Sequence, residues 1–272
     1  NDMSKLVFFD IDGTLLDSEM QVPESTMQAL HRLKENGHKI AICSGRPYSI
    51  IYPFLLELGF DGVVASAGAY IRKGNDVIYH STLEHSKLQE LVDLFDRHGA
   101  AYFLQGYPGR FLTAASNAVM AQALSGGKTA DSIRKDMVVC ENPAVIKDLE
   151  CGVYFHADAT VAELQKELDA RTDGYFKLTG CSFGDDIIYS GEMTKRGVNK
   201  ATGMQRLLDS MGLSQEDSVA FGDGSNDYEM IEYAETGVVM GNGLPGLKAQ
   251  ADYVTTDIHA DGIWNGLKHL DL

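Results

Sequence analysis

Short, unbroken apolar runs that alternate with amphipathic segments constrain the fold of this chain more than any other feature of its sequence. The runs Leu6–Phe9, Ile40–Cys43 and Val63–Ala65 are apolar at every position, a pattern typical of strands buried on both faces of a parallel sheet. Between them, apolar residues three or four apart predict helices over residues 24–36 and 49–58. Because such strands and helices join through right-handed crossovers, we predict an α/β fold with a Rossmann-like parallel sheet.

The pattern changes in the middle of the chain and returns near its end. A hairpin is predicted over residues 69–79, and the stretch after it mixes helices and strands without the same buried runs. Buried runs return at Val219–Phe221 and Val238–Met240. We therefore predict two domains: a discontinuous core, residues 1–82 and 189–272, and an inserted α+β domain, residues 83–188.

The acidic composition narrows the set of partners. The 272 residues include 23 Lys and Arg against 39 Asp and Glu, which gives a formal net charge of −16 at pH 7. Such a charge repels nucleic acids and anionic lipid surfaces at long range, so we expect neither as a partner. A small anionic substrate is still compatible with it where a metal ion concentrates positive charge. The oligomeric state is left open, and a monomer is compatible with the sequence.

Other global features predict a cytoplasmic protein. No stretch approaches the roughly 18 uninterrupted apolar residues of a membrane-spanning helix, and the first residues lack a cationic-then-apolar secretory pattern. The four cysteines form no Cys-x-x-Cys pair, which argues against a zinc site and against a disulfide framework. They are Cys43, Cys140, Cys151 and Cys181.

Polar residues follow several of the predicted strands. Ligands of open α/β sheets bind beyond the carboxyl ends of the strands, so residues at these ends are candidate site residues. The first strand is followed by Asp10, Asp12, Gly13 and Thr14, the second by Ser44 and Gly45, and the strand at Val219 by Asp223, Asn226 and Asp227, while Lys200 begins the helix before that last strand.

This set of side chains predicts a magnesium site. Four carboxylates at one sheet edge would repel each other unless a cation compensates them. Mg²⁺ takes oxygen ligands at about 2.0 to 2.1 Å from carboxylates, water and substrate phosphate, which suits a set without His or Cys. We therefore expect Mg²⁺ as the cofactor.

Phosphoryl transfer is the chemistry that such a set can perform. A carboxylate on a tight turn can attack phosphorus, and a second carboxylate two positions later can act as acid and base. A lysine, a hydroxyl and loop N–H groups can donate hydrogen bonds to the phosphoryl oxygens. Among the candidate site residues, Lys200 is the one that the sequence distinguishes least clearly, because two other basic residues, Lys195 and Arg196, lie close to it.

Four segments of the chain resemble, in order and spacing, the motifs of haloacid dehalogenase-like hydrolases, and most closely those of the Cof-type phosphatases. The segments are FFDIDGTLLD, ICSGRP, RGVNKA and FGDGSNDYEM. The resemblance covers the whole chain and implies an inserted cap of the larger α+β kind, the C2B type. Two positions depart from the usual pattern, since Ala201 stands where the family usually has Gly and Ala67-Gly68 where Asn-Gly is common.

Carried over residue by residue, the resemblance implies a role for each candidate. Asp10 would be the nucleophile and Asp12 the general acid and base. Ser44 and Lys200 would contact the phosphoryl group, together with Thr14, Gly45 and Asn226. Mg²⁺ would be held by Asp10, the carbonyl of Asp12 and Asp223, with Asp227 supporting the metal-bound waters.

The predicted function is a Mg²⁺-dependent phosphatase that hydrolyses small phosphorylated metabolites, such as sugar phosphates, through an aspartyl-phosphate intermediate. Two alternatives stay open: a phosphohexomutase-type enzyme, and a non-hydrolytic phosphoacceptor similar to a receiver domain. Asp12 argues against the second alternative, since an acid and base near the nucleophile promotes turnover.

A glycine pattern near the end of the chain also matches a dinucleotide-binding fingerprint by letter. It reads Gly241-x-Gly243-x-x-Gly246, follows a late strand and contains Pro245. We interpret it as a loop, because the fingerprint requires a glycine-rich turn after the first strand of a βαβ unit.

Overall fold

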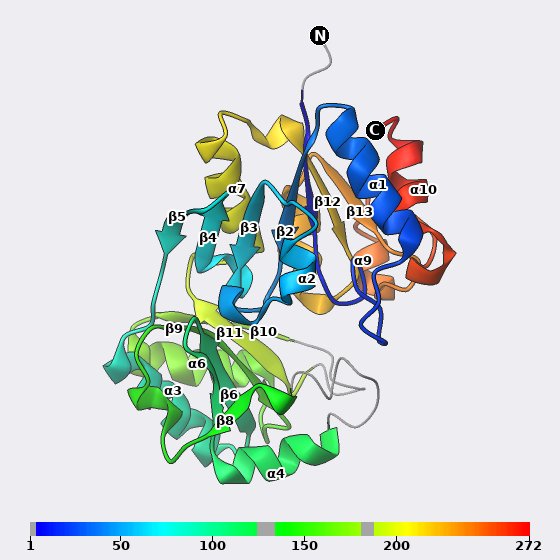
Figure 1. Ribbon diagram of the computed structural model, residues 1–272. Helices are drawn as coiled ribbons and strands as arrows, with labels where there is room; N and C mark the ends of the chain where they lie inside the picture. Colours follow the sequence, from blue (N-terminus) through cyan, green and yellow to red (C-terminus); the bar gives the residue numbers. More distant parts are fainter. Residues whose placement is uncertain (1–3, 124–133, 181–187) are drawn as a thin grey trace. The chain divides into compact units, whose positions relative to one another are not determined.

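The computed structural model describes residues 4–123, 134–180 and 188–272. The chain forms two compact units (Figure 1). The first, called the sheet unit below, comprises residues 1–45, 51–79 and 200–272, and the second, called the inserted unit, comprises residues 46–50 and 80–199. Cys43, Cys140 and Cys151 are free thiols, and Cys181 lies outside the described residues.

The sheet unit contains an eight-stranded sheet within the described residues. Its order is β14-β13-β12-β1-β2-β3-β4-β5, with parallel pairing from β14 to β3 and antiparallel pairing between β3 and β4. The strands are β1 (Leu6–Phe9), β2 (Lys39–Cys43), β3 (Gly62–Ala65), β4 (Tyr70–Lys73), β5 (Asp76–His80), β12 (Ser218–Gly222), β13 (Thr236–Val239) and β14 (Tyr253–Val254).

Helices cover both faces of this sheet (Figure 1). One face packs alternate residues of the central strands, such as Phe8 and Ala220, with apolar residues of α7, α8 and α9. On the other face, the ring of Phe9 stacks on that of Phe221, with ring centroids 5.3 Å apart. Helix α10 packs against Phe221 through Gly266, and α1 packs on α10. The helices are α1 (Glu24–Glu35), α2 (Pro53–Leu56), α7 (Lys200–Ser210), α8 (Tyr228–Tyr233), α9 (Pro245–Lys248) and α10 (Gly262–His269).

The inserted unit contains a six-stranded sheet within the described residues, ordered β10-β11-β9-β6-β7-β8. Its pairs are antiparallel except β7 with β8. Helices α3 and α6 pack on one face, and α4 packs against β6, where Met120 joins a second core on the opposite face. The elements are α3 (His85–Arg97), β6 (Ala101–Gly106), β7 (Gly109–Leu112), α4 (Ala114–Ala123), β8 (Met137–Val139), β9 (Leu149–Phe155), α6 (Val161–Thr172), β10 (Phe176–Gly180) and β11 (Gly191–Lys195).

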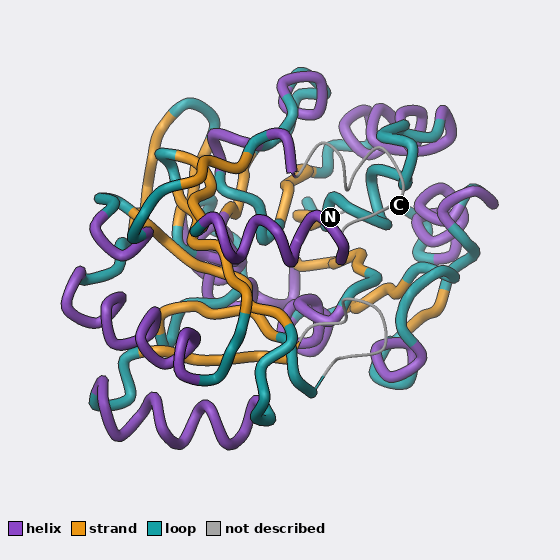
Figure 2. Tube along the Cα trace, turned by 90° about the horizontal axis from the view of Figure 1, so that it is seen from below, coloured by secondary structure: helices purple, strands orange, loops and turns teal. Residues whose placement is uncertain are grey.

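The predicted fold class is confirmed. The chain combines a parallel-sheet core with an inserted α+β segment, and Figure 2 shows the strands of the chain among the helices that cover them. Across the three described stretches, no helix combines the length and the apolar character needed to cross a membrane.

One predicted helix was wrong. Residues 49–58 do not form a continuous helix but a 3-10 turn, Tyr48–Ile50, and the four-residue α2. Pro53 is the reason, because proline lacks the N–H that a helix interior requires and disfavours helical backbone at the residue before it. Tyr52 is accordingly extended, and the helix begins at Pro53.

Candidate active site

The parallel pairing of the strands brings the predicted site residues to one edge of the sheet. β1 lies between β2 and β12, so Asp10, Ser44 and Asp223 each follow the end of one of three adjacent strands. The backbone N of Asp10 still donates to the carbonyl of Phe221 at 3.1 Å, which continues the ladder into the loop. Long-range strand order therefore places residues more than 200 positions apart in sequence side by side.

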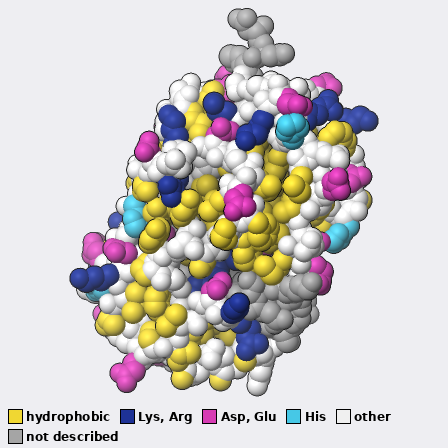
Figure 3. Space-filling view, in the orientation of Figure 1, with side chains coloured by type: hydrophobic (Ala, Val, Ile, Leu, Met, Phe, Trp, Pro, Cys, Tyr) yellow, Lys and Arg dark blue, Asp and Glu magenta, His cyan; other side chains and the backbone are white. Residues whose placement is uncertain are grey.

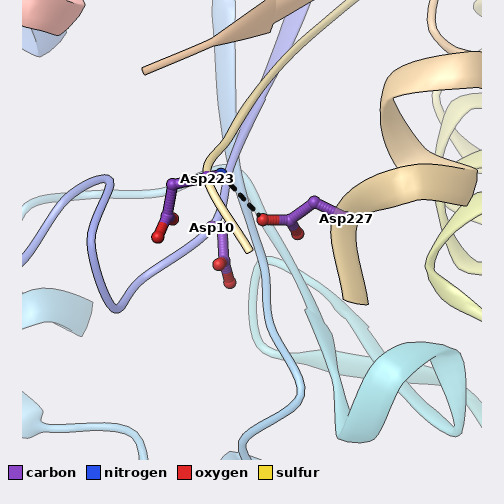
Figure 4. Close-up of side chains that lie close together, drawn as sticks. All are labelled: Asp10, Asp223 and Asp227. Atoms are coloured by element: carbon purple, nitrogen blue, oxygen red, sulfur yellow. Dashed lines mark hydrogen bonds between the residues drawn. The ribbon is translucent and has the colours of Figure 1, made fainter. Parts of the chain in front are cut away.

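Three carboxylates meet at this edge. Asp10, Asp223 and Asp227 each offer an oxygen, and these atoms lie within 4.8 Å of one another. Figure 4 shows the side chains of Asp10 and Asp223 beside each other, with Asp227 approaching from the segment that leads into α8. Asp10 is 7% exposed and Asp227 is fully buried, so water alone cannot screen their repulsion.

Lys200 supplies positive charge to this cluster. It is the first residue of α7 and is 1% exposed. Its Nζ donates to Asp10 Oδ1 at 2.9 Å and to Asp227 Oδ1 at 2.7 Å, with Asn226 Oδ1 at 3.4 Å. The ammonium group therefore links the carboxylate that follows β1 to the segment that follows β12.

Asp227 also closes the turn that carries Asp223. Its Oδ2 accepts from the backbone N of Asp223 at 2.9 Å (Figure 4). The same oxygen accepts from the backbone N of Gly224 at 3.0 Å. Both oxygens of Asp227 thus accept hydrogen bonds from protein donors. This geometry suits a residue that orients Lys200 and Asp223, while its predicted support of metal-bound waters stays a prediction.

Asp223 is held by the loop that follows β1. The hydroxyl of Thr14 donates to Asp223 Oδ1 at 2.7 Å. Gly13 has a φ of +83°, and a Cβ built on it would lie 2.1 Å from Asp223 Oδ2, so a side chain at this position would displace the carboxylate. The structure thus places Thr14 as a partner of Asp223, and its predicted contact with phosphate stays a prediction.

The electrostatics of the cluster indicate a shortage of positive charge. Burial raises the pKa of Asp10 well above its usual value, and Asp227 and Asp223 raise it further against the opposing effect of Lys200. Burial, followed by Asp227, raises the pKa of Asp223 to about 7. Burial alone would lower the pKa of Lys200, but Asp10 and Asp227 raise it well above its usual value, so this lysine stays charged.

The remaining predicted residues lie on neighbouring loops. Ser44 is 2% exposed at the end of β2, and a Cβ on Gly45 would lie 3.2 Å from Asn226 Nδ2. The segment after β2 therefore approaches the segment after β12. Asp12 is partly buried in the loop after β1, where its backbone forms a bridge with Leu16.

Comparison with known proteins identifies the family. A model of the haloacid dehalogenase-like hydrolases matches residues 7–267. The chain belongs to the haloacid dehalogenase-like hydrolases. The putative phosphatase YkrA of Bacillus subtilis (strain 168) is 30% identical over 269 residues, which cover 99% of this chain and 98% of the relative.

Other members of the family are similar along nearly the whole chain. The 5-amino-6-(5-phospho-D-ribitylamino)uracil phosphatase YitU of Bacillus subtilis (strain 168) is 29% identical, over 97% of this chain and 96% of the relative. The solved structure of the subclass IIB sugar phosphatase BT4131 superposes with a TM-score of 0.78 and 27% identity, over 98% of this chain and 99% of the other. The predicted family, Cof-type, and the predicted enzyme class, a phosphoric monoester hydrolase, are confirmed.

One departure from the family pattern has a structural consequence. Ala67, where Asn is common in the family, adopts a left-handed backbone with φ 53° and ψ 35°. Asparagine tolerates this conformation better than alanine does. The backbone N of Ala67 donates to the carbonyl of Ser44 at 2.9 Å, so this turn supports the segment that follows β2.

Asn242 is a residue near this site that the sequence-based prediction missed. Its Nδ2 donates to the carbonyl of Gly13 at 2.9 Å. The signal was present as the Gly241-x-Gly243 pattern, which our interpretation treated only as a loop. The sequence pattern does not indicate which residues this loop contacts.

Proposed function

We propose that this haloacid dehalogenase-like hydrolase is a Mg²⁺-dependent phosphatase that hydrolyses small phosphorylated metabolites, sugar phosphates or similar phosphomonoesters, through an aspartyl-phosphate on Asp10. The observation that carries the proposal is the buried Lys200, hydrogen-bonded to the buried Asp10 beside a second carboxylate, the partly buried Asp223. The names of YitU and BT4131, a phosphatase of a phosphorylated ribitylaminouracil and a sugar phosphatase, support a small organic phosphate as substrate.

The donor set at this edge fits Mg²⁺. All the candidate ligands are oxygens, and three carboxylates face one ammonium group, so a divalent cation would offset the excess negative charge. Asp10, Asp223 and the carbonyl of Asp12 are the groups proposed to hold it. When bound, Mg²⁺ would neutralise charge on the phosphoryl oxygens and bring the phosphate close to Asp10.

The proposed reaction has two displacements at phosphorus. A carboxylate oxygen of Asp10 attacks phosphorus, the bond from phosphorus to the alcohol oxygen breaks, and Asp12 in its acid form protonates that oxygen. Water then attacks the aspartyl-phosphate while Asp12 takes its proton, and the bond between Asp10 and phosphorus breaks to release phosphate. Lys200, Ser44, Gly45 and Asn226 are proposed to hold the phosphoryl oxygens by hydrogen bonds.

Replacing the nucleophile tests this proposal. We expect Asp10→Asn to lower kcat for p-nitrophenyl phosphate by roughly a thousandfold or more, because an amide cannot form the covalent intermediate. Asp209→Asn is the matched control, since Asp209 is an exposed carboxylate on α7. EDTA should abolish the wild-type activity, and added Mg²⁺ should restore it.

Trapping the intermediate identifies the residue directly. Borohydride reduces an acyl phosphate to an alcohol, so rapid quenching with borohydride followed by peptide mass spectrometry should locate the change at Asp10. Near wild-type turnover by Asp10→Asn, or full activity in EDTA, would contradict the proposal. Hexose 1-phosphate converted to its isomer without free phosphate would indicate the mutase alternative, and a phosphoprotein stable for hours would indicate the phosphoacceptor.

The predicted roles of the other regions stay predictions. These are the action of the inserted unit as a cap that selects substrates, the monomeric state and the cytoplasmic location. A panel of phosphorylated metabolites is the direct measurement of substrate preference.

A further inference from the structure

The loop after β13 carries the Gly241-x-Gly243 pattern, and close backbone packing explains both glycines. A Cβ on Gly241 would lie 2.5 Å from the backbone N of Asp257, and one on Gly243 would lie 3.3 Å from the Cα of Asp223. The backbone N of Leu244 donates to the carbonyl of Asp223 at 3.0 Å. This loop therefore packs directly on the backbone of a residue that we propose to hold Mg²⁺.

Asn242, between these glycines, joins two other loops. Its Nδ2 donates to the carbonyl of Gly13 at 2.9 Å, and its Oδ1 accepts from the backbone N of Ile258 at 2.9 Å. One partner is an acceptor and the other a donor, which determines the orientation of the side-chain amide. Although its side chain is exposed, Asn242 connects the loop after β1 to the segment after β14.

Gly13 is the position at which this connection affects the site. Its Cα lies so close to Asp223 that an added Cβ would be 2.1 Å from Oδ2, and its nitrogen shares a peptide group with the carbonyl of Asp12. A displaced Gly13 would therefore move both the Asp223 carboxylate and the Asp12 carbonyl. These are two of the three groups proposed to hold Mg²⁺.

We propose that Asn242 is a positioning residue for the metal, holding Gly13 against Asp223 through its hydrogen bond to the Gly13 carbonyl. The inference rests on the proposed function, because it needs Mg²⁺ at this edge of the sheet. Asn242 acts through Gly13 and contacts none of the reacting atoms. Partners of metal ligands commonly control metal affinity in this way.

Calorimetric titration of metal-free protein with MgCl₂ tests the proposal without relying on activity. Asn242→Ala removes both hydrogen bonds, whereas Asn242→Asp keeps an acceptor for Ile258 but faces the Gly13 carbonyl with an oxygen. Asn265→Ala is the matched control, because the Asn265 amide donates to Thr256 Oγ1 at 2.9 Å and to the Ala260 carbonyl at 3.1 Å. Thermal unfolding in EDTA measures the structural cost of each variant.

We expect both Asn242 variants to weaken Mg²⁺ binding by about tenfold, the lower end of the effect of losing a direct partner of a metal ligand, because Asn242 acts one residue further away, through Gly13. Asn265→Ala should bind Mg²⁺ like the wild type, even if its unfolding temperature falls as much as that of Asn242→Ala. The KM for p-nitrophenyl phosphate at saturating Mg²⁺ should stay close to the wild-type value.

Three results would overturn the inference. The first is wild-type affinity of Asn242→Ala for Mg²⁺. The second is wild-type affinity of Asn242→Asp alone, because this variant keeps only the bond to Ile258. A wild-type protein that binds no Mg²⁺ would overturn both this inference and the metal dependence of the proposed function. If the wild type binds Mg²⁺ and hydrolyses p-nitrophenyl phosphate while Asn242→Ala is unaffected, only the inference fails.

Discussion

Among single residues, Tyr102 in β6 has a polar atom whose removal has a clear expected effect. Its side chain is 1% exposed, and its hydroxyl has no hydrogen-bond partner among the described residues. Burying a hydroxyl without a partner costs free energy that phenylalanine avoids at nearly the same volume. We expect Tyr102→Phe to raise the free energy of unfolding by about 1 kcal/mol, measured by urea denaturation.

Tyr175 provides the matched control within the inserted unit. Its hydroxyl accepts a hydrogen bond from the backbone N of Glu84 at 3.1 Å. Tyr175→Phe removes a hydroxyl that has a partner, so it should lower the free energy of unfolding by about 0.5 to 1 kcal/mol. The same sign of change for both variants would contradict this explanation.

At the scale of secondary-structure elements, helix α7 contains a glycine, Gly203, at which we expect tight packing to outweigh the higher helix propensity of alanine. Gly203 lies inside this helix, and a Cβ on it would lie 2.5 Å from Val64 Cγ1 and 3.0 Å from the Cα of Gly68. Alanine is favoured over glycine in a helix by about 1 kcal/mol, but overpacking costs typically about 1 to 3 kcal/mol. We expect Gly203→Ala to lower the thermal unfolding temperature and, by moving Lys200, to lower kcat.

The same helix offers a control for propensity alone. Gln205 is exposed two positions after Gly203, so Gln205→Gly should cost about 0.7 to 1 kcal/mol without changing the packing on β3. If Gly203→Ala proves more stable than the wild type, the contact with Val64 does not constrain the helix.

At the largest scale, charged side chains of both signs lie apart from one another on the face of the molecule drawn in Figure 3. In the inserted unit, His98 and two carboxylates form a cluster of charged groups. The Nδ1 of His98 lies 2.6 Å from Asp158 Oδ1, and its Nε2 lies 2.7 Å from Glu167 Oε2. These contacts connect the end of α3 to α6 and to the segment after β9.

This cluster makes stability depend on pH. Hydrogen bonds to Glu167 and Asp158 raise the pKa of His98, while the bond to His98 lowers the pKa of Glu167 with help from Arg97. The contribution of His98 is therefore complete below the unfolded-state value of about 6.5 and is lost as pH rises through its higher folded-state pKa. That of Glu167 is present above about pH 4.3 and is lost at lower pH.

We expect His98→Gln to lower the unfolding temperature of the protein more at about pH 5.5 than at about pH 9. The reason is that the substitution removes a positive charge only at pH values at which His98 is protonated. His31→Gln is the control, since the ring of His31 faces a single carboxylate, Glu35, at 3.0 Å and its side chain is 74% exposed. Scanning calorimetry across this pH range measures both variants. An equal loss at both pH values would show that His98 acts by packing alone.

The fold class and the four motifs could be predicted from the amino-acid sequence alone. Runs such as Leu6–Phe9 are apolar at every position because both faces of a parallel strand are buried, and this information is local. Strand ends then carry the polar residues of the site, so Asp10 and Asp223 could be singled out without coordinates. The break at Pro53 is also local information, because proline lacks the N–H that a helix interior requires, even where the apolar spacing is that of a helix.

The contacts among these residues, in contrast, could not be predicted before the folded chain was known. Lys195, Arg196 and Lys200 lie within six positions of one another, yet Arg196 pairs with Asp169 at 2.8 Å while Lys200 reaches Asp10. The bond of Thr14 to Asp223 and that of Asn242 to Gly13 likewise join residues more than 200 positions apart. Local patterns specify helices and strands, whereas such contacts depend on the order in which strands pair and on side-chain packing, which no short stretch of sequence contains.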